Sequence, residues 1–304
     1  MIVAGGTTFG TDSGGRYQPS ADRWAPIAQA PFMMTSVDQV GVWTGSEVIV
    51  YGGTVPMLAY DPRANTWRVA SNTGAPAGKS GYSVVWTGSE LIVWGGAANN
   101  GVRLPTGARY NPVTDSWRPV TSNGAPAARE RHSAVWVGRE MIVWGGVLAS
   151  GEITSSGARY DPATDTWTSL PLAGAPAGRY GHTAVWAGGA MIVWGSTAGG
   201  GRYVPANDAW SPVSTQCAPS VREAQRAVSD GSRMILWGGA TPGYTQAYAQ
   251  GAIYDPVADT WMLITSASGP SPRYGHSLVW TGSEAIVWGG SDGGPLGTGG
   301  RYVP

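Results

Sequence analysis

Several residue types are almost absent from this chain of 304 residues, and each scarcity narrows what the protein can be. A single cysteine, Cys217, excludes an internal disulfide and a metal site made of several cysteines. Charged side chains make up only 12% of the chain, and nineteen basic residues balance nineteen acidic ones. This balance gives no electrostatic reason to expect nucleic acid as a partner. Apolar runs are too short for a transmembrane helix, which argues against membrane insertion.

A repeated segment is the most prominent feature that is present. A short apolar run that ends in a small residue occurs seven times, with starts 43 to 51 residues apart. The copies are Met1–Gly6, Val48–Gly53, Leu91–Gly96, Met141–Gly146, Met191–Ser196, Met234–Gly239 and Ala285–Gly290. Repeats of this length are typical of solenoids and radial arrays. Each repeat carries four short β-prone segments, a to d, bounded by glycine, proline and aspartate, which predicts antiparallel strands joined by tight turns. Four such strands per repeat are typical of a β-propeller blade.

Aromatic residues recur with the same regularity. A tyrosine in segment c is followed seven residues later by a tryptophan in segment d, as in Tyr110 and Trp117 or Tyr160 and Trp167. Two further sets of tryptophans lie in segments a and b, and the three sets account for all sixteen tryptophans. We therefore expect the tryptophans to pack between neighbouring blades, which leaves none for a dedicated sugar-binding platform.

Three motifs occur together in most repeats. Arg179-Tyr-Gly-His182 precedes an a segment, a double glycine ends most b segments, and Tyr160-Asp-Pro162 is followed by Trp167. This combination resembles the Kelch repeat, and the resemblance covers nearly the whole chain. It implies an all-β, Kelch-type β-propeller of four-stranded antiparallel blades. It implies little about activity, because this fold carries enzymes, adaptors and carbohydrate-binding proteins.

The two ends of the chain do not complete a repeat. The chain begins with segments b, c and d and ends with a, b and c. The last a segment has a hairpin partner across a short turn in Ala285–Gly290, and local pairing has the smaller loop-closure cost. We therefore predict a single domain over residues 1–304 with seven blade units, the first and last incomplete; the alternative is six blades closed by the terminal strands. Met1 occupies the position of internal methionines, which is consistent with a fragment of a longer chain or with a reading frame begun at an internal methionine.

Strand order predicts that the two ends of a blade differ. The a–b and c–d turns are short and uniform, whereas the b–c loops vary in length and share their end with the d–a connections. Variable loops on a rigid scaffold commonly carry binding sites, so we place the functional face there, around the mouth of a central channel. The candidate ligand-binding residues are Asp38, Gln39, Tyr82, Arg129, Glu130, Arg131, His132, His182, Arg222, Glu223, Gln225, Tyr244, Tyr248 and His276.

Three histidines in this set invite a metal hypothesis. His132, His182 and His276 hold one position of the repeat, where other copies have glutamine or tyrosine. One position in separate blades favours a scaffold role, so we predict neither a metal site nor a cofactor. A copper radical oxidase of the galactose oxidase kind is rejected as well, because Cys217 lies in a linker without an evident tyrosine ligand.

Residues that break the repeat are the strongest ligand candidates. Arg131 stands where neighbouring repeats have glycine, and by position it matches an arginine that Kelch adaptor domains use to hold acidic peptide side chains. A guanidinium can bind a carboxylate through two hydrogen bonds. The alternative is an Arg–Glu pair within the scaffold.

Two functions follow from these residues. The leading prediction is a non-catalytic binding module that recognises a protein segment or glycan, with an anionic ligand favoured. The alternative is a carbohydrate-active enzyme resembling the Kelch-type sialic-acid mutarotases, in which Arg131, Glu130 and Glu223 act on an acidic sugar. One lysine, Lys79, accompanies eighteen arginines, which favours a bacterial source. With the richness in tryptophan and glycine, we expect a secreted or periplasmic protein.

Overall fold

The computed structural model describes residues 1–4, 14–32, 34, 39–52, 56–78, 80–264 and 269–304. Contacts divide the chain into two compact units, which are treated separately below. Unit 1 comprises Met1–Met141, Leu148–Gly151 and Tyr160–Thr168, and unit 2 comprises Ile142–Val147, Glu152–Arg159 and Ser169–Pro304. The division falls within the fourth repeat.

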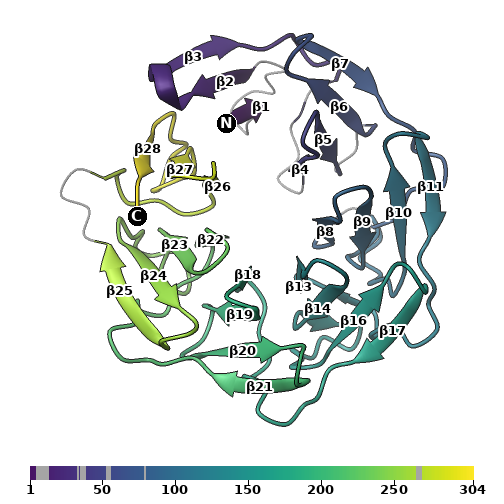
Figure 1. Cartoon of the computed structure of the whole chain (residues 1–304), viewed down its shortest axis with the longest axis vertical. Helices are drawn as coiled ribbons and strands as arrows, with labels where there is room; N and C mark the ends of the chain where they lie inside the picture. Colours follow the sequence, from purple (N-terminus) through teal and green to yellow (C-terminus); the bar gives the residue numbers. More distant parts are fainter. Residues whose placement is uncertain (5–13, 33, 35–38, 53–55, 79, 265–268) are drawn as a thin grey trace. The chain divides into compact units, whose positions relative to one another are not determined.

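Each repeat forms one antiparallel sheet with its strands in the order a, b, c and d (Figure 1). In unit 1 the first sheet holds strands b to d, and the next two sheets hold all four. Their strands are β1 (Ile2–Ala4), β2 (Gly14–Gln18) and β3 (Arg23–Pro26); β4 (Val40–Trp43), β5 (Val48–Tyr51), β6 (Leu58–Asp61) and β7 (Thr66–Val69); and β8 (Ser83–Trp86), β9 (Leu91–Trp94), β10 (Gly107–Asn111) and β11 (Ser116–Pro119). A single-turn 3-10 helix, η1 (Pro19–Ala21), links β2 to β3.

The remaining sheets repeat this plan. The fourth holds β13 (Ser133–Trp136), β14 (Met141–Trp144), β16 (Gly157–Asp161) and β17 (Thr166–Ser169), beside a small pair of β12 (Arg129–Glu130) and β15 (Val147–Leu148). Unit 2 continues with β18 (Thr183–Ala187), β19 (Ala190–Trp194), β20 (Gly200–Val204) and β21 (Ala209–Pro212); β22 (Arg226–Ser229), β23 (Met234–Trp237), β24 (Gly251–Asp255) and β25 (Thr260–Ile264); and β26 (Ser277–Trp280), β27 (Ala285–Trp288) and β28 (Gly299–Tyr302).

The described residues therefore form seven sheets of the repeat, the all-β fold of a seven-bladed β-propeller. The first and last sheets are three-stranded, as the sequence predicts. Local pairing of the last a strand is confirmed, because β26 pairs with β27 from Ser277 opposite Trp288 to Trp280 opposite Ala285.

The seven-residue spacing of tyrosine and tryptophan is the register of the c–d hairpin. Tyr110 lies directly opposite Trp117, and Tyr254 lies opposite Trp261. The ring centroids of these pairs are 5.2 Å and 4.9 Å apart. The hairpin turn ends on Asp115 with φ 49°, a left-handed conformation that aspartate tolerates. Cross-strand aromatic pairs of this kind stabilise the outer hairpin of each sheet.

The apolar core lies between neighbouring sheets. All four residues of β9 are buried, and so are those of β14 and β23. In unit 1 one apolar cluster joins β5 and β6 to β9 and β10, and in unit 2 another joins β19 to β23 and β24. Because a b strand is covered on both faces, it reads as a continuous apolar run rather than as an alternating one.

The tryptophans do not all share this burial. Those of β11, β17, β21 and β25 are only 7 to 8% exposed, and those of β9, β14, β19 and β23 are 0 to 4% exposed. The tryptophans of the a strands are half-buried, and Trp43 is 51% exposed. Within the a set, Trp86 and Trp280 still pack against clusters that join neighbouring sheets, so the prediction that the tryptophans pack between blades holds for them in part; it fails for Trp43, and Trp24 of the d set is 38% exposed. The a strand is an edge strand of its sheet, so one side of its tryptophan stays in contact with solvent.

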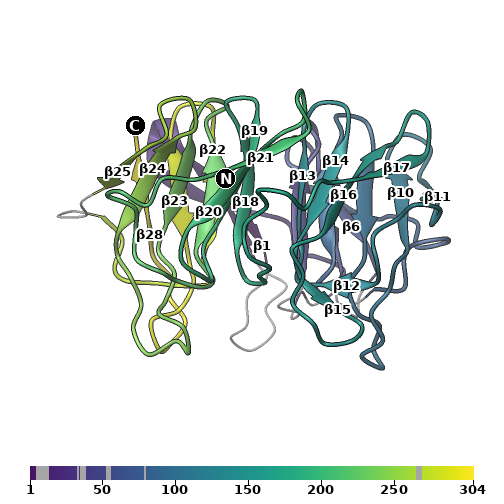
Figure 2. The same ribbon diagram turned by 90° about the horizontal axis from the view of Figure 1, so that it is seen from below.

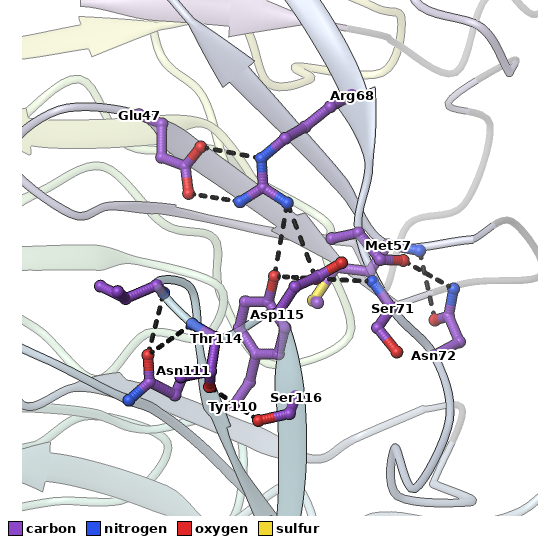
Figure 3. A network of polar contacts seen from close by, with 12 residues as sticks. Glu47, Met57, Arg68, Ser71, Asn72, Tyr110, Asn111, Thr114, Asp115 and Ser116 are labelled. Atoms are coloured by element: carbon purple, nitrogen blue, oxygen red, sulfur yellow. Dashed lines mark hydrogen bonds and ion pairs between the residues drawn. The ribbon is translucent and has the colours of Figure 1, made fainter.

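Hydrogen bonds fasten a sheet to the preceding one at a joint that recurs along the chain (Figure 3). The indole Nε1 of Trp117 donates to the Ser71 carbonyl at 2.7 Å. The Ser71 amide donates to Asp115 at 2.9 Å, a bond drawn in Figure 3. The Tyr110 hydroxyl also donates to Asp115, at 2.5 Å, and receives a bond from Arg68. The indole bond recurs in the pairs Trp67 with Ala28, Trp167 with Thr121, and Trp261 with Ser214.

Among the joints that involve a d-strand tryptophan, the one at Trp210 in unit 2 lacks the indole and amide bonds in the described residues. Pro171 stands where the other joints have alanine, serine or threonine, and proline has no amide hydrogen to donate to Asp208. The buried Nε1 of Trp210 has no hydrogen-bond partner among the described residues. Ring contacts remain: Trp210 lies 5.2 Å from Tyr203 and 5.6 Å from Trp144, measured between centroids.

Candidate functional site

The b–c loops and the d–a connections meet at one end of the sheets, which we call the loop end. In unit 1, Ala97 after β9 and Ser80 before β8 exchange both backbone hydrogen bonds. In unit 2, Ala240 after β23 and Glu223 before β22 form the same pair. The long loop from β23 to β24 extends beyond the sheets from this end (Figure 2). The loop end is thus where variable loops lie against the starts of the a strands, as the sequence predicts.

Two of the three predicted histidines pack on the tryptophan of the preceding b strand. His132 is buried, its ring lies edge-on to Trp94, and its Nε2 is 2.8 Å from Ser83 Oγ. His182 makes the same edge contact with Trp144. Among the described residues, no group of three or more His, Cys, Asp and Glu side chains is placed to hold a metal ion. These imidazoles are contacts between sheets.

In other repeats, glutamine or tyrosine occupies the histidine position and contacts the preceding sheet. Gln225 is buried and donates from Nε2 to the Trp194 carbonyl at 3.2 Å. Tyr82 is buried and donates from its hydroxyl to the Tyr51 carbonyl, also at 3.2 Å. Gln39 is half-buried at this position of the repeat. The side chains at this position of the repeat therefore make contacts within the scaffold at the loop end. Their contact with a ligand stays a prediction.

Two of the predicted ligand arginines, Arg129 and Arg222, are each only 1% exposed. Arg222 donates from Nη1 to the carbonyls of Gly238 and Gln250, at 3.0 Å and 3.2 Å, and its guanidinium lies 4.2 Å from the Tyr248 ring centroid. Burial lowers the pKa of both arginines to about 10. The same kind of carbonyl contact is made by Arg179 and Arg273. The arginine at this position of the repeat therefore lies inside the scaffold. In Arg179, Arg222 and Arg273 its guanidinium donates to carbonyls at the two ends of a b–c loop.

Arg131 differs from these because it is exposed and its backbone is left-handed. Its φ is 56°, and its amide donates to the Gly81 carbonyl at 2.7 Å. The equivalent positions are Gly81, Gly181, Gly275 and Ala224, with φ between 51° and 67°. A left-handed conformation costs a residue with a Cβ about 1–2 kcal/mol. Strain of this kind, at a position where glycine would serve, is an indication of function.

The neighbouring carboxylate belongs to an ion pair across two repeats. Arg103, in the b–c loop after β9, donates from Nε and Nη2 to Oε1 of Glu130, at 3.0 Å and 2.8 Å. The cation of this pair is Arg103, so the alternative from the sequence, an Arg–Glu pair made by Arg131, stays a prediction. The enzyme alternative, which uses Glu130 on an acidic sugar, stays a prediction.

A second group of candidates gathers at the loop end of unit 2. Tyr244 is 48% exposed with φ 60°, and its ring lies 5.0 Å from that of Tyr274 in an edge-to-face arrangement. Tyr248, further along the same loop, covers Arg222, and Glu223 is half-buried beside it in sequence. Asp38 lies outside the described residues. The loop between β23 and β24 thus brings two predicted tyrosines to the starts of the last two sheets.

A family model matches more than half of the chain. It is described as the KLHDC2/KLHL20/DRC7 Kelch-repeats domain, and it matches residues 34–211. The chain belongs to the Kelch-repeat family. No curated protein matches it. Kelch propellers are typically protein-interaction modules. Within the described ranges, no helix is long and apolar enough to cross a membrane.

The Kelch pattern also shows what sequence reasoning missed. Arg226, the first residue of β22, is exposed at the loop end, and it was not among the predicted site residues. The position holds a small hydroxyl residue in four other repeats, at Ser83, Ser133, Thr183 and Ser277. Comparing the residue at this position across the repeats would have identified Arg226, since an arginine in place of serine breaks the pattern as clearly as Arg131 does.

Proposed function

We propose that this Kelch chain is a binding module that recognises an acidic segment of a partner protein at the loop end of unit 1, with Arg131 binding a carboxylate. The family supports a protein partner, because Kelch propellers typically bind proteins. The observation that carries the proposal is the exposed guanidinium of Arg131 on a left-handed backbone.

The scaffold uses the backbone of this residue, and glycine would supply that backbone with less strain. The amide of Arg131 bonds to Gly81, as the amide of Gly275 bonds to Ala224 in unit 2. The equivalent positions hold glycine or alanine, so a long charged side chain is particular to this repeat. A guanidinium binds a carboxylate through two parallel hydrogen bonds, which gives both affinity and orientation. Because the group is exposed, such binding is expected to weaken as salt concentration rises.

The test compares Arg131→Gly with a matched arginine at the other end of the strands. The probe is a fluorescent glutamate-rich peptide, with the glutamine version of the same peptide as its neutral control. We expect Arg131→Gly to lose at least tenfold in affinity for the acidic peptide while its melting temperature is unchanged or higher, because glycine relieves the strain at φ 56°. Arg63→Gly, in the exposed turn between β6 and β7, should bind as the unmodified protein does. Equal affinity of the Arg131→Gly variant and the unmodified protein, or an equal loss in both variants, would overturn the proposal.

A further inference from the structure

Arg226 has a guanidinium that the scaffold scarcely uses. Within the described part of the chain its one hydrogen bond runs from Nε to the His276 carbonyl, at 3.2 Å. Its terminal nitrogens have no hydrogen-bond acceptor among the described residues, and the residue is exposed. The acidic residue on the same hairpin, Asp230, is held by Arg233 at 2.8 Å. Arg226 is thus a cation at the loop end of unit 2 that has no carboxylate partner in the described part of the chain.

Arg226 also replaces a serine that contacts a histidine in another repeat. His132 Nε2 lies 2.8 Å from Ser83 Oγ, and Arg226 stands in the serine position with respect to His276. His276 is 1% exposed, and neither of its ring nitrogens has a hydrogen-bond partner among the described residues. Burial, together with the charges of Arg226 and Arg273, lowers the pKa of His276 to about 3. Arg226 thus takes the place of a hydroxyl that contacts a histidine in another repeat, and it bonds to the His276 carbonyl through Nε instead.

Two tyrosines meet at the segment to which Arg226 is bonded. Arg226 donates to the carbonyl of His276, and Tyr274, whose ring lies 5.0 Å from that of Tyr244, stands two residues before His276. Tyr244 contacts Tyr274 edge to face, and it is held at φ 60° although it carries a large side chain. The same loop presents Thr241 and Thr245, whose hydroxyls lie 2.8 Å apart. A phenol ring and a guanidinium held at the same short segment, with hydroxyls in the loop of Tyr244, offer an apolar surface and a carboxylate-binding group at one end of unit 2.

We propose that Arg226, Tyr244 and Tyr274 form a binding site for a small carboxylate carried on a ring with an apolar face, the chemistry of a uronic acid. The carboxylate binds the terminal nitrogens of Arg226, and the ring packs against the exposed Tyr244. All three residues belong to unit 2, so this site is independent of the acidic-segment site at Arg131 in unit 1.

The experiment is isothermal titration calorimetry with D-glucuronate, with D-glucose and acetate as probes that lack the carboxylate and the ring, respectively. We expect glucuronate to bind at least tenfold more tightly than either. Arg226→Ser places the residue of Ser83 and Ser277 at this position, and it should reduce glucuronate affinity at least tenfold with an unchanged or higher melting temperature. Tyr244→Gly, which suits φ 60°, should reduce the affinity in the same direction.

Two further variants make the outcome specific. Arg233→Ser, in the turn between β22 and β23 at the other end of the strands, should leave glucuronate binding unchanged, and so should Arg131→Gly. Loss of acidic-peptide binding in Arg131→Gly concerns the other site and is measured separately. Absence of glucuronate binding, equal binding by Arg226→Ser and the unmodified protein, or acetate binding as tight as that of glucuronate would overturn the ring-carboxylate site.

Discussion

The indole of Trp117 donates to the carbonyl of Ser71 across 2.7 Å, and this bond ties a sheet to the segment that leaves the preceding sheet. Trp210 holds the same position of its repeat, yet its buried Nε1 has no hydrogen-bond partner among the described residues. Both rings are 8% exposed, so burial does not distinguish them. The two tryptophans therefore form a natural pair for measuring what the joint bond contributes.

Phenylalanine substitutions at these two positions isolate that bond. Trp117→Phe and Trp210→Phe remove the same volume, but only Trp117→Phe breaks a hydrogen bond and leaves a carbonyl unpaired. We expect Trp117→Phe to lower the free energy of unfolding by about 1 kcal/mol more than Trp210→Phe. Urea denaturation followed by tryptophan fluorescence and by circular dichroism measures both values. Equal losses would mean that the bond contributes nothing to stability.

Truncation of a d-strand tryptophan should be far more costly than truncation of an a-strand one. Trp167 is buried, with ring centroids 5.5 Å from Trp94 and 4.9 Å from Tyr160, and Trp167→Ala should destabilise by about 3–5 kcal/mol. Trp43 is 51% exposed, and Trp43→Ala should cost about 1 kcal/mol or less. Thermal and urea unfolding of the two variants check this order. A loss below about 1 kcal/mol in Trp167→Ala would show that the packing role is wrong.

The regular parts of the fold could be read from the sequence because they are fixed by spacing. The seven residues between Tyr110 and Trp117 are the register of a hairpin, and a hairpin register is a local property. The candidate site depends on backbone conformation and side-chain burial, which the spacing of residues in the sequence does not predict. Arg129 and Arg131 stand two residues apart and look alike in sequence, yet one is buried and the other is exposed at φ 56°. The exposure of the a-strand tryptophans escaped prediction for a similar reason, since their periodicity matches that of the buried sets.

The histidines make stability depend on pH near neutrality. Burial lowers the pKa of His182 to about 3, with Arg179 acting in the same direction, whereas an unfolded histidine titrates near ~6.5. A neutral folded histidine contributes stability that is fully present above the unfolded pKa and is lost as pH falls toward the folded one. Between pH 6.5 and 5.5 the expected loss from His182 is about 1 kcal/mol.

His182→Gln tests this dependence, since Gln225 fills the same position of another repeat. The variant should show a shallower fall of melting temperature from pH 7 to pH 5 than the unmodified protein. Ala184→Gly, two residues along the same strand, serves as a control that lowers stability without changing its pH dependence. Parallel pH profiles for His182→Gln and the unmodified protein would contradict the assignment.

The aspartates of the joints should account for most of the loss of stability at acid pH. Burial acts to raise the pKa of Asp165, but hydrogen bonds from Tyr160 and Thr121 outweigh it, and the folded pKa is lowered. Stability from this group is therefore fully present above the unfolded pKa, near ~3.9, and is lost as pH falls through the folded value.

Asparagine already fills this position in one joint, where Asn65 accepts bonds from the Tyr60 hydroxyl and the Ala28 amide. Asp165→Asn should change stability at pH 7 by about 1 kcal/mol or less and should flatten the acid limb between pH 4 and pH 2.5. Melting temperatures across this range give the comparison. A steeper acid limb in the variant would show that the aspartate is not the titrating group.

The proline at the Trp210 joint has a mechanical consequence. In a repeat protein each unit is held by its neighbours, and cooperativity is set by the strength of each interface. Four joints along the chain carry an indole-to-carbonyl bond, whereas at Pro171 neither the indole bond nor an amide donor is present in the described residues. Among the joints that involve a d-strand tryptophan, the one between the fourth and fifth repeats is therefore expected to open first when the chain is placed under tension.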